Sequence, residues 1–469
     1  MKQHVHEIRD LPLERCAASL SQFLGTVFLD SSDAKSMWSR FSYLGFLPFM
    51  TTSVSNGITT VITRSGQRSY FTNDPFSVLQ SQYERFKETT TLDRPWTFSS
   101  GLMGCFSYEA ARYFSDFSTL LKETTVPEIL IGFYDRVLIF DHVERRLYLV
   151  VTEFPSVDNR FSISDFFHLI EENKLSSNAL FLGQVEQCVT HEYYSQQFDR
   201  LKTYIRAGDC YQANLTCKYE VPILEDGNLF SFYTVLRRQS PAPFSAYLNW
   251  GDSHVFSSSP ERFFSISDGH IQTRPIKGTA KRCVDPVEDA RQKSALLASK
   301  KDAAELTMIV DLLRHDLAKV CAYGSVHVPE LRTIEAYRYV YHLVATVEGV
   351  LNPSATFLDV FKSLFPGGSI TGAPKIRAME VISELEQSAR NVYTGSIGYA
   401  DFSGSCDFNI AIRTLYREAV GSDSRFGKLA FHVGGGIVAD SVCHLEWDET
   451  LAKAEGMRRS INYFLRKGA

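Results

Sequence analysis

The sequence predicts an α+β fold with a sizeable core. Strand-like and helix-like segments follow one another without strict alternation, which favours α+β over a doubly wound parallel sheet. Hydrophobic residues make up 44% of the 469 residues and charged residues 22%, which is ordinary globular composition. A chain of this length is expected to form roughly three average domains or two large ones.

Charge and cysteine usage narrow the class of protein. The formal net charge of -5 argues against a nucleic acid as the main ligand, although a local basic pocket could still bind a small anion. The nine cysteines are scattered without a C-x-x-C pair, which predicts a reducing cytoplasm and neither a disulfide framework nor a structural zinc. No secretory h-region opens the chain, and no apolar run approaches the ~18 residues of a membrane span.

The first part of the chain, residues 1–185, is predicted to be mostly strands with a few helices. No nucleophile and base are spaced here in a way that predicts catalysis, so this part is interpreted as scaffold or as a small-ligand pocket. The segments 137–140 and 146–151 flank a short polar connection and are expected to form a hairpin. The other expected strands are 24–29, 57–63, 99–107 and 129–133.

The polar segment 171–182 is the best candidate boundary, so residues 186–469 are taken as a second domain. Helical spacing over 190–207 ends at Gly208, a common C-cap. Strands are expected at 210–215, 244–248, 255–258, 262–267, 396–399, 408–415 and 429–433. Helices are expected at 289–320 (one or two), 357–365, 374–386 and 445–465.

The chain is organised around one amine, Lys277, in the segment TRPIKGT. A strand is expected to begin near His270 and to break at Gly278. Pro275 lacks a backbone donor, so it must lie at an edge or at the end of strand pairing. Taken by itself, Lys277 could be a solvated lysine or a functional amine.

Two helices present acidic residues on one face. Helical geometry places Glu305 among Met308, Ile309 and Leu312, with Asp302 one turn earlier. A carboxylate on an apolar face is unusual unless something pairs with it.

The C-terminal helix repeats this spacing with Glu446 and Glu449, and Lys453 follows Glu449 at i+4. Two such helices could hold Mg2+, which prefers oxygen ligands. The alternative is two solvated faces with ordinary Glu449–Lys453 pairing.

The glycine-rich segment 365–375 is a candidate anion cradle. Ser369 or Thr371 could cap the following helix, and Pro374 suits the first helical position. Free N–H groups at such a helix start bind carboxylate or phosphate. The spacing is not that of a Walker A loop.

Further anion-binding groups are expected near the C-terminus. Gly434, Gly435 and Gly436 follow a strand and form either a backbone nest or a tight turn. Arg413 lies in an otherwise apolar predicted strand, where it either binds a carboxylate or makes a structural salt bridge.

A proton donor is a further candidate. Glu261 follows Pro260 between two expected strands, where a carboxyl with a raised pKa could act as a general acid or could simply occupy a surface turn. His342 lies in an apolar segment and is interpreted more readily as a hydrogen-bonded core histidine than as a ligand.

As an ordered set these motifs resemble the chorismate-utilising enzymes, which include anthranilate synthase component I, isochorismate and salicylate synthases and aminodeoxychorismate synthase component I. The motifs are PIKGT, AELTMIVDLLRHD, PGGSITGAPKIRAME, GSIGY, FNIAIRTL and GGGIVADS followed by E-x-x-E. The resemblance is strong over 187–462 and weaker before it. It implies two large antiparallel sheets packed as a sandwich with helices outside, and two domains joined in one globular unit.

Two positions indicate a branch of the family. Lys277 resembles the lysine of the aminodeoxychorismate synthases, whereas anthranilate synthases carry alanine in that slot. Gln212 stands where isochorismate and salicylate enzymes have a water-activating lysine. The resemblance is therefore closest to the aminodeoxychorismate synthase component I branch, with anthranilate synthase component I as the alternative.

The resemblance implies a site and a reaction. Lys277 would form a covalent adduct with chorismate, Glu261 would protonate the leaving hydroxyl, and Mg2+ would be held by Glu305 and Glu449 with Asp302 and Glu446 ligating directly or through water. Ammonia would then displace the lysine. The residues implied to contact the substrate are Gln212, Gly278, Thr279, His342, Ser369, Tyr393, Arg413, Gly434, Gly435 and Gly436.

The resemblance also implies partners. No glutaminase domain is evident in the chain, so ammonia is expected from a glutamine amidotransferase subunit (component II) or from free ammonium. A tryptophan-type pocket, structural or regulatory, is expected from Ser31, Trp38, Ser39, Arg40, Phe41, Pro243, Phe244 and Ser245.

Overall fold

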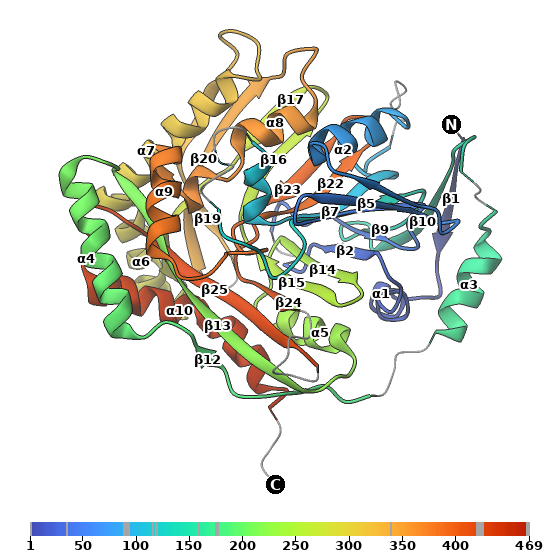
Figure 1. The fold of residues 1–469 in the computed structure, drawn as a ribbon, viewed down its shortest axis with the longest axis horizontal. Coiled ribbons are helices and arrows are strands. Elements are labelled where there is room, and N and C mark those ends of the chain that lie inside the picture. The colour runs from blue at the N-terminus through green and yellow to red at the C-terminus, as the bar shows by residue number, and fades with distance from the viewer. Residues whose placement is uncertain are drawn as a thin grey trace.

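Two large antiparallel β-sheets dominate the computed structural model (Figure 1), which confirms the predicted α+β class. The structure describes residues 2–465 except 34–35, 88–93, 115–116, 118–120, 158–159, 174–177, 338–339 and 419–425. No helix in these described ranges is long and apolar enough to cross a membrane. All nine cysteines are free thiols; a cytoplasmic location stays a prediction.

The first sheet has thirteen strands. Their order is β1 (Lys2–Ile8), β10 (Arg146–Glu153), β9 (Arg136–Asp141), β3 (Phe41–Gly45), β2 (Thr26–Asp30), β14 (Phe244–Trp250), β15 (Ser253–Ser259), β24 (Thr414–Glu418), β25 (Lys428–Ile437), β13 (Gln212–Glu225) and β11 (Phe181–Leu182), with β12 (Glu186–Gln187) and β21 (Gly372–Ala373) also paired to β13.

The second sheet has twelve strands. Their order is β18 (Ile276–Lys281), β20 (Val340–Val350), β17 (His270–Thr273), β16 (Arg262–Ser267), β23 (Cys406–Asn409), β22 (Ser396–Asp401), β7 (Gly101–Phe106), β8 (Ile129–Tyr134), β4 (Met50–Ser55), β5 (Ile58–Thr63) and β6 (Arg68–Phe71), with β19 (His327–Ala336) also paired to β20. Each sheet contains strands from both sides of residue 185, so the two predicted domains share both sheets.

The sheets pack face to face, and helices cover their outer faces. Val27 and Leu248 of the first sheet meet Met103 and Leu130 of the second in one buried cluster. The next side chain along β2, Phe28, points to the opposite face, as the two-residue period of a strand requires. This arrangement is the sandwich with outer helices that the family resemblance implied.

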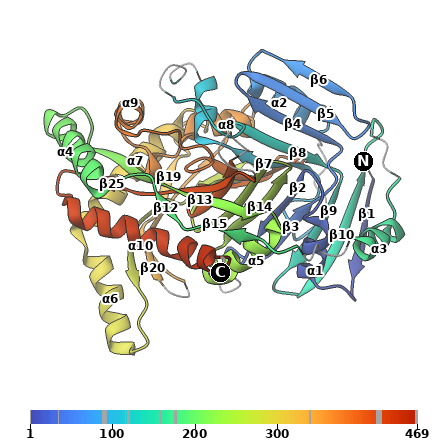
Figure 2. The same cartoon turned by 60° about the horizontal axis from the view of Figure 1, so that its bottom comes forward.

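The helices divide between the two outer faces. Packed on the first sheet are α1 (Leu13–Leu20), α3 (Ile163–Glu172), α4 (His191–Ala207), α5 (Leu229–Gln239), α9 (Lys375–Leu385) and α10 (Cys443–Asn462); on the second are α2 (Pro75–Glu84), α7 (Lys300–Ala318) and α8 (Phe357–Leu364). The helix α6 (Pro286–Ala298) extends away from the body in Figure 2. Two short 3-10 turns are η1 (Tyr108–Tyr113) and η2 (Gly368–Ile370).

Local sequence patterns predicted several helices and strands correctly. The helix α4 begins after Thr190, whose side chain accepts from Tyr193 N, and ends at Gly208 with φ +82°. The strands β9 and β10 form the expected antiparallel hairpin. The buried strand expected within 99–107 is β7, in which every residue is buried.

The single strand expected over 408–415 is wrong. Its first part, β23, belongs to the second sheet, and its last part, β24, belongs to the first. Between them the chain crosses from sheet to sheet, and Ile410 and Ala411 are buried during the crossing. The run is apolar because it passes through the interior, which sequence periodicity alone does not distinguish from a buried strand.

The strand expected from His270 to Gly278 is also wrong in its limits. Pro275 interrupts it, so β17 ends at Thr273 and β18 begins at Ile276, both along the same side of β20. Gly278, at φ +77°, lies in a register shift between Lys277 and Thr279, and pairing continues beyond it.

Two predictions about glycine-rich segments also need correction. Gly434, Gly435 and Gly436 form neither a turn nor a nest after a strand but lie inside β25, paired with β13. A Cβ on Gly434 would lie 2.3 Å from Leu215 O, so glycine permits this close pairing. The helix α9 begins at Lys375, one residue later than predicted, and Pro374 is its N-cap. Neither Ser369 nor Thr371 caps it, and the Thr371 hydroxyl donates to Gly367 O instead.

Candidate active site

A cavity of about 550 Å3 brings together nearly all of the residues predicted to act on a ligand. The strands β18, β20 and β25, the helices α7 and α10, and the segment before α9 contribute to its lining. The predicted residues that line it are Glu261, Lys277, Gly278, Thr279, Asp302, Glu305, His342, Ser369, Tyr393, Arg413, Gly434, Gly435, Gly436, Glu446 and Glu449.

The amine of Lys277 is held inside this cavity. It extends from β18 and donates a hydrogen bond of 3.1 Å to the carbonyl oxygen of Ser369. Burial lowers the pKa of Lys277, while Glu305 and Glu261 act in the opposite direction. A lysine with a lowered pKa has a larger neutral, nucleophilic fraction near neutral pH.

Gly278 allows the acidic helix to approach this lysine. A Cβ at that position would lie 2.8 Å from Cγ of Asp302 and 2.9 Å from Leu296 Cδ1. The positive φ of Gly278 adds a second reason for glycine, since a side chain would strain this backbone. Glycine at this position therefore brings α7 against β18.

Glu261 lies at the junction between β15 and β16, only 4% exposed. One carboxyl oxygen accepts from Ile276 N at 3.5 Å. Burial raises the pKa of Glu261, while Lys277 among its neighbours acts to lower it. A buried carboxyl and a half-buried amine with oppositely shifted pKa values are a suitable pair for an acid and a nucleophile.

Four carboxylates form the acidic wall of the cavity: Asp302 and Glu305 from α7, and Glu446 and Glu449 from α10. The ammonium groups of Lys301 and Lys453 form ion pairs with three of these carboxylates. Nζ of Lys301 lies 3.2 Å from Glu446 Oε1 and 3.9 Å from Glu305 Oε1.

In the described ranges no three His, Cys, Asp or Glu side chains converge tightly enough to ligate one ion. The donor set nevertheless fits Mg2+, because it consists of carboxylates, and the ammonium of Lys301 shows that a cation can be accommodated between the two helices. Binding of an ion would require these side chains to turn toward one another. The metal assignment stays a prediction.

Arg413 supplies a positive charge to the same cavity as the four acids. It lies in the crossing between the two sheets with φ +50°, a conformation that costs a non-glycine residue about 1–3 kcal/mol. Burial lowers the pKa of its guanidinium. The side chain of Arg413 is half-buried, and in the described part of the chain no hydrogen-bond acceptor for it is found, so an anionic ligand in the cavity would satisfy this fork.

His342 and Thr279 contact each other across the strand pair β18–β20. Thr279 Oγ1 lies 3.0 Å from His342 Nδ1. Burial, together with Arg413, lowers the pKa of His342 to about 3, so the ring is neutral at physiological pH. It can therefore orient a ligand through hydrogen bonds without adding charge.

Gln212 is the one residue of the implied substrate set that does not line the cavity. It is fully buried behind Gly436, where a Cβ would meet its Nε2 at 2.6 Å. Neither amide atom has a hydrogen-bond partner in the described ranges. The glycine therefore leaves room for the glutamine side chain.

Sequence reasoning missed Lys301 and gave Lys453 only a surface role. Lys453 lines the cavity, donates to Gly434 O at 2.9 Å and pairs with Glu449 at 2.8 Å. The i, i+4 spacing of each lysine to a glutamate was a usable signal. That spacing does not show which side of a helix faces a cavity.

A second cavity of about 300 Å3 is lined by most of the residues expected to form a tryptophan-type pocket. Seven of the eight predicted residues line it, namely Ser31, Trp38, Arg40, Phe41, Pro243, Phe244 and Ser245. Ser39 is buried outside the lining. The guanidiniums of Arg262 and Arg274 both lie over the ring of Trp38, 4.6 and 4.7 Å from its centroid.

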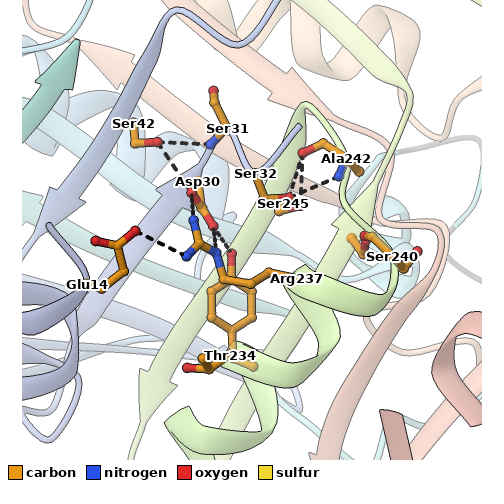
Figure 3. A network of polar contacts seen from close by, with 12 residues as sticks. Glu14, Asp30, Ser31, Ser32, Ser42, Thr234, Arg237, Ser240, Ala242 and Ser245 are labelled. Atoms are coloured by element: carbon orange, nitrogen blue, oxygen red, sulfur yellow. Dashed lines mark hydrogen bonds and ion pairs between the residues drawn. The ribbon is translucent and has the colours of Figure 1, made fainter. Parts of the chain in front are cut away.

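A buried polar network supports one wall of this second cavity (Figure 3). Asp30 accepts from Arg237 Nε at 2.6 Å and from Tyr233 at 2.9 Å, and Ser42 donates to Asp30 and accepts from the backbone N–H of Ser31. These contacts hold the end of β2 in place. They do not identify an occupant, so tryptophan stays a prediction.

Comparison with known proteins places these observations in a family. Residues 37–459 match the family described as chorismate binding enzyme. The chain is 37% identical to aminodeoxychorismate synthase component 1 of Escherichia coli (strain K12), over 94% of each chain. It is 34% identical to anthranilate synthase component 1 of Bacillus subtilis (strain 168), over 93% of this chain and 87% of the relative.

Among solved structures, the fold is similar to anthranilate synthase component I from Streptococcus pneumoniae TIGR4. The TM-score is 0.74 at 28% sequence identity, covering 91% of this chain and 93% of that one. The anthranilate-synthase-like architecture implied by the sequence motifs is thereby confirmed.

Proposed function

This chain belongs to the chorismate binding enzymes, and on that premise we propose that it converts chorismate and ammonia into 4-amino-4-deoxychorismate. The observation that carries the proposal is the amine of Lys277, which lies in one cavity with Glu261 and Arg413. The greater identity to the aminodeoxychorismate synthase relative, 37% against 34%, supports the same choice over anthranilate synthase.

The cavity offers separate groups for the two carboxylates of chorismate. Arg413 provides a fork for one of them, and Tyr393 also contributes to the lining. The backbone of Gly278 and of the glycines in β25 can approach the ligand closely because no Cβ intervenes. His342 would contact the ring as a neutral donor or acceptor.

Lys277 and Glu261 carry the covalent step. The neutral amine attacks C2 of the ring, the two double bonds shift, and the C4–O bond breaks. Glu261 gives its proton to the departing hydroxyl, which leaves as water. Ammonia then adds at C4, the double bonds return, and the C2–N bond to Lys277 breaks; Glu261 regains a proton from the adding nitrogen. The raised pKa of Glu261 and the lowered pKa of Lys277 support these roles.

A magnesium ion would be bound by Glu305 and Glu449, with Asp302 and Glu446 ligating directly or through water. When bound, it would supply positive charge that attracts the ring carboxylate and withdraws electron density from the ring.

The proposed reaction needs partners on both sides. The relatives are named component 1, and we propose that a glutamine amidotransferase subunit supplies ammonia to this chain as well. The product still carries its enolpyruvyl group, so a separate lyase must release 4-aminobenzoate for folate biosynthesis. The tryptophan-type pocket would have either a structural or a regulatory role.

Incubation with chorismate, Mg2+ and ammonium tests the proposal directly. Added aminodeoxychorismate lyase should release 4-aminobenzoate, which chromatography detects. Anthranilate, recognised by its fluorescence without any lyase, would instead establish the alternative reaction. Consumption of chorismate to neither product would contradict both.

A further inference from the structure

The acidic wall already contains a cation of the protein's own. Lys301 extends from the first turn of α7, and its ammonium lies 3.2 Å from Glu446 Oε1 and 3.9 Å from Glu305 Oε1. Glu446 is only 5% exposed. Among the described residues, Lys301 is the positively charged side chain that pairs with Glu446, so it reduces the cost of burying this carboxylate.

Three lysines share this cavity, and they are held differently. Lys277 donates to the carbonyl of Ser369, and Lys453 donates to the carbonyl of Gly434. For Lys301, only carboxylate partners are found in the described ranges, and its side chain is 46% exposed. An ammonium bound only by carboxylates at the mouth of a cavity can return to water without breaking a backbone hydrogen bond.

The carboxylates that hold Lys301 are two of the four proposed to bind Mg2+. An ion between α7 and α10 would need the same oxygen atoms, and it would repel the ammonium. Lys301 and the metal therefore cannot both occupy this position.

We propose that Lys301 is an exchangeable internal cation, which neutralises the acidic wall before the metal binds and moves into solvent when the metal arrives. This inference rests on the proposed function, because it assumes that the wall is a magnesium site. It makes Lys301 a positioning residue that sets metal affinity. In the metal-free protein Lys301 joins α7 to α10, and in the metal-bound protein the ion takes over that connection.

The alternative is a permanent salt bridge that holds the two helices at the spacing the metal needs. The two roles predict opposite effects of removing the charge. If Lys301 competes with the metal, its removal tightens metal binding; if it builds the site, its removal weakens binding.

Lys301→Met separates these roles, because it keeps most of the aliphatic stem and removes the ammonium. The matched control is Lys300→Met, since Lys300 is exposed, carries the same charge and is adjacent in α7. Titration of the metal-free full-length chain with MgCl2 alone should give a dissociation constant about three- to tenfold lower for Lys301→Met. The dissociation constant of Lys300→Met should stay within about twofold of the wild-type value, because an exposed charge acts on the site only at long range and is screened by salt.

Thermal unfolding provides a second readout that does not depend on activity. Without Mg2+, Lys301→Met should unfold at a lower temperature than the wild type, and saturating Mg2+ should remove most of that difference. Lys301→Arg, which retains the charge, should behave like the wild type in both measurements.

Equal or weaker Mg2+ binding by Lys301→Met would overturn the proposal, as would an equal shift in Lys300→Met. Failure of the metal site itself is recognised separately: the wild type would then show no Mg2+ binding, or Glu305→Gln would titrate like the wild type. That result overturns the exchange as well. Formation of 4-amino-4-deoxychorismate would still decide the proposed function independently.

Discussion

Nζ of Lys277 donates a hydrogen bond to the carbonyl oxygen of Ser369, 92 residues further along the chain. A carbonyl orients the amine without giving it a full counter-charge, so burial can still lower its pKa. The neighbouring carbonyl of Ile370 accepts from the buried guanidinium of Arg390 at 2.9 Å. The acceptor of the lysine is therefore fixed by a second buried contact.

Lys277→Ala should reduce formation of 4-amino-4-deoxychorismate at least about 100-fold, because the proposed covalent route loses its nucleophile. The lyase-coupled 4-aminobenzoate assay measures this loss, and anthranilate fluorescence shows whether the other reaction appears. Lys281→Ala is the control, since Lys281 is an exposed residue of the same strand. An undiminished yield from Lys277→Ala would remove the amine from the mechanism.

Glu261→Gln should lower kcat by about 10²- to 10⁴-fold, the usual contribution of a general acid. The wild-type rate should rise with pH as Lys277 loses its proton and fall as Glu261 loses its own. The raised pKa of Glu261 and the lowered pKa of Lys277 bring the rising and falling limbs of the pH–rate profile closer together. The variant should lose the limb that belongs to Glu261, whereas an unchanged pH profile would contradict its role as the acid.

Arg413→Lys should raise KM for chorismate roughly 10- to 100-fold, since an ammonium cannot bind a carboxylate through two parallel hydrogen bonds. Both side chains bear the same backbone strain at φ +50°, so folding should change little. Initial rates over a range of chorismate concentrations separate KM from kcat. Arg332→Lys, at an exposed position of β19, is the control.

Glu305→Gln should raise the Mg2+ concentration needed for half-maximal rate by about tenfold or more, because the proposed charged oxygen ligand becomes a neutral amide. Asp311→Asn is the matched control: it lies on the same helix and pairs with Arg314 at the surface. The measurement is a Mg2+ titration of the initial rate. Superimposable titrations of Glu305→Gln and the wild type would contradict the metal assignment.

A pH-dependent change in stability is expected at Glu109, which is buried on η1 and accepts from Arg390 N at 2.8 Å. Burial raises the pKa of Glu109 to about 7. Because the pKa is higher in the folded protein than in the unfolded chain, the Glu109 carboxyl stabilises the fold most below pH 4.5, where it is protonated in both states. This contribution to the free energy of unfolding is lost as the pH rises through 7. Glu109→Gln should therefore match the wild type near pH 4 and become more stable above pH 7, by up to about 3 kcal/mol.

Urea unfolding at several pH values tests this expectation. The control is Glu172→Gln, because Glu172 is an exposed helix residue. If the stability difference between Glu109→Gln and the wild type did not depend on pH, the folded protein would not ionise Glu109 in this pH range, and the prediction would be wrong.

Much of the fold was accessible from local patterns. Alternation and turn residues located β9 and β10, and a Thr cap with a C-terminal glycine located α4. The prediction of a single strand over 408–415 was wrong because a chain that crosses between two sheets is as apolar as a buried strand. The prediction of a nest or turn at the glycines of β25 was wrong because a glycine run is typical of turns. Only the pairing with β13 shows that these glycines belong to a strand.

The sequence alone determined which chemical groups this protein carries and in what order, and that order sufficed to indicate the family. The tertiary structure decided which of those groups meet. Lys277, Glu261, Arg413 and the four acids come from separate elements, and only the packing of both sheets with α7 and α10 brings them to one cavity. It also decided that Gln212 lies behind Gly436 and that Lys301 enters the acidic wall. The physical reason is that local propensity acts over a few residues, whereas burial and charge pairing here join residues up to hundreds of positions apart.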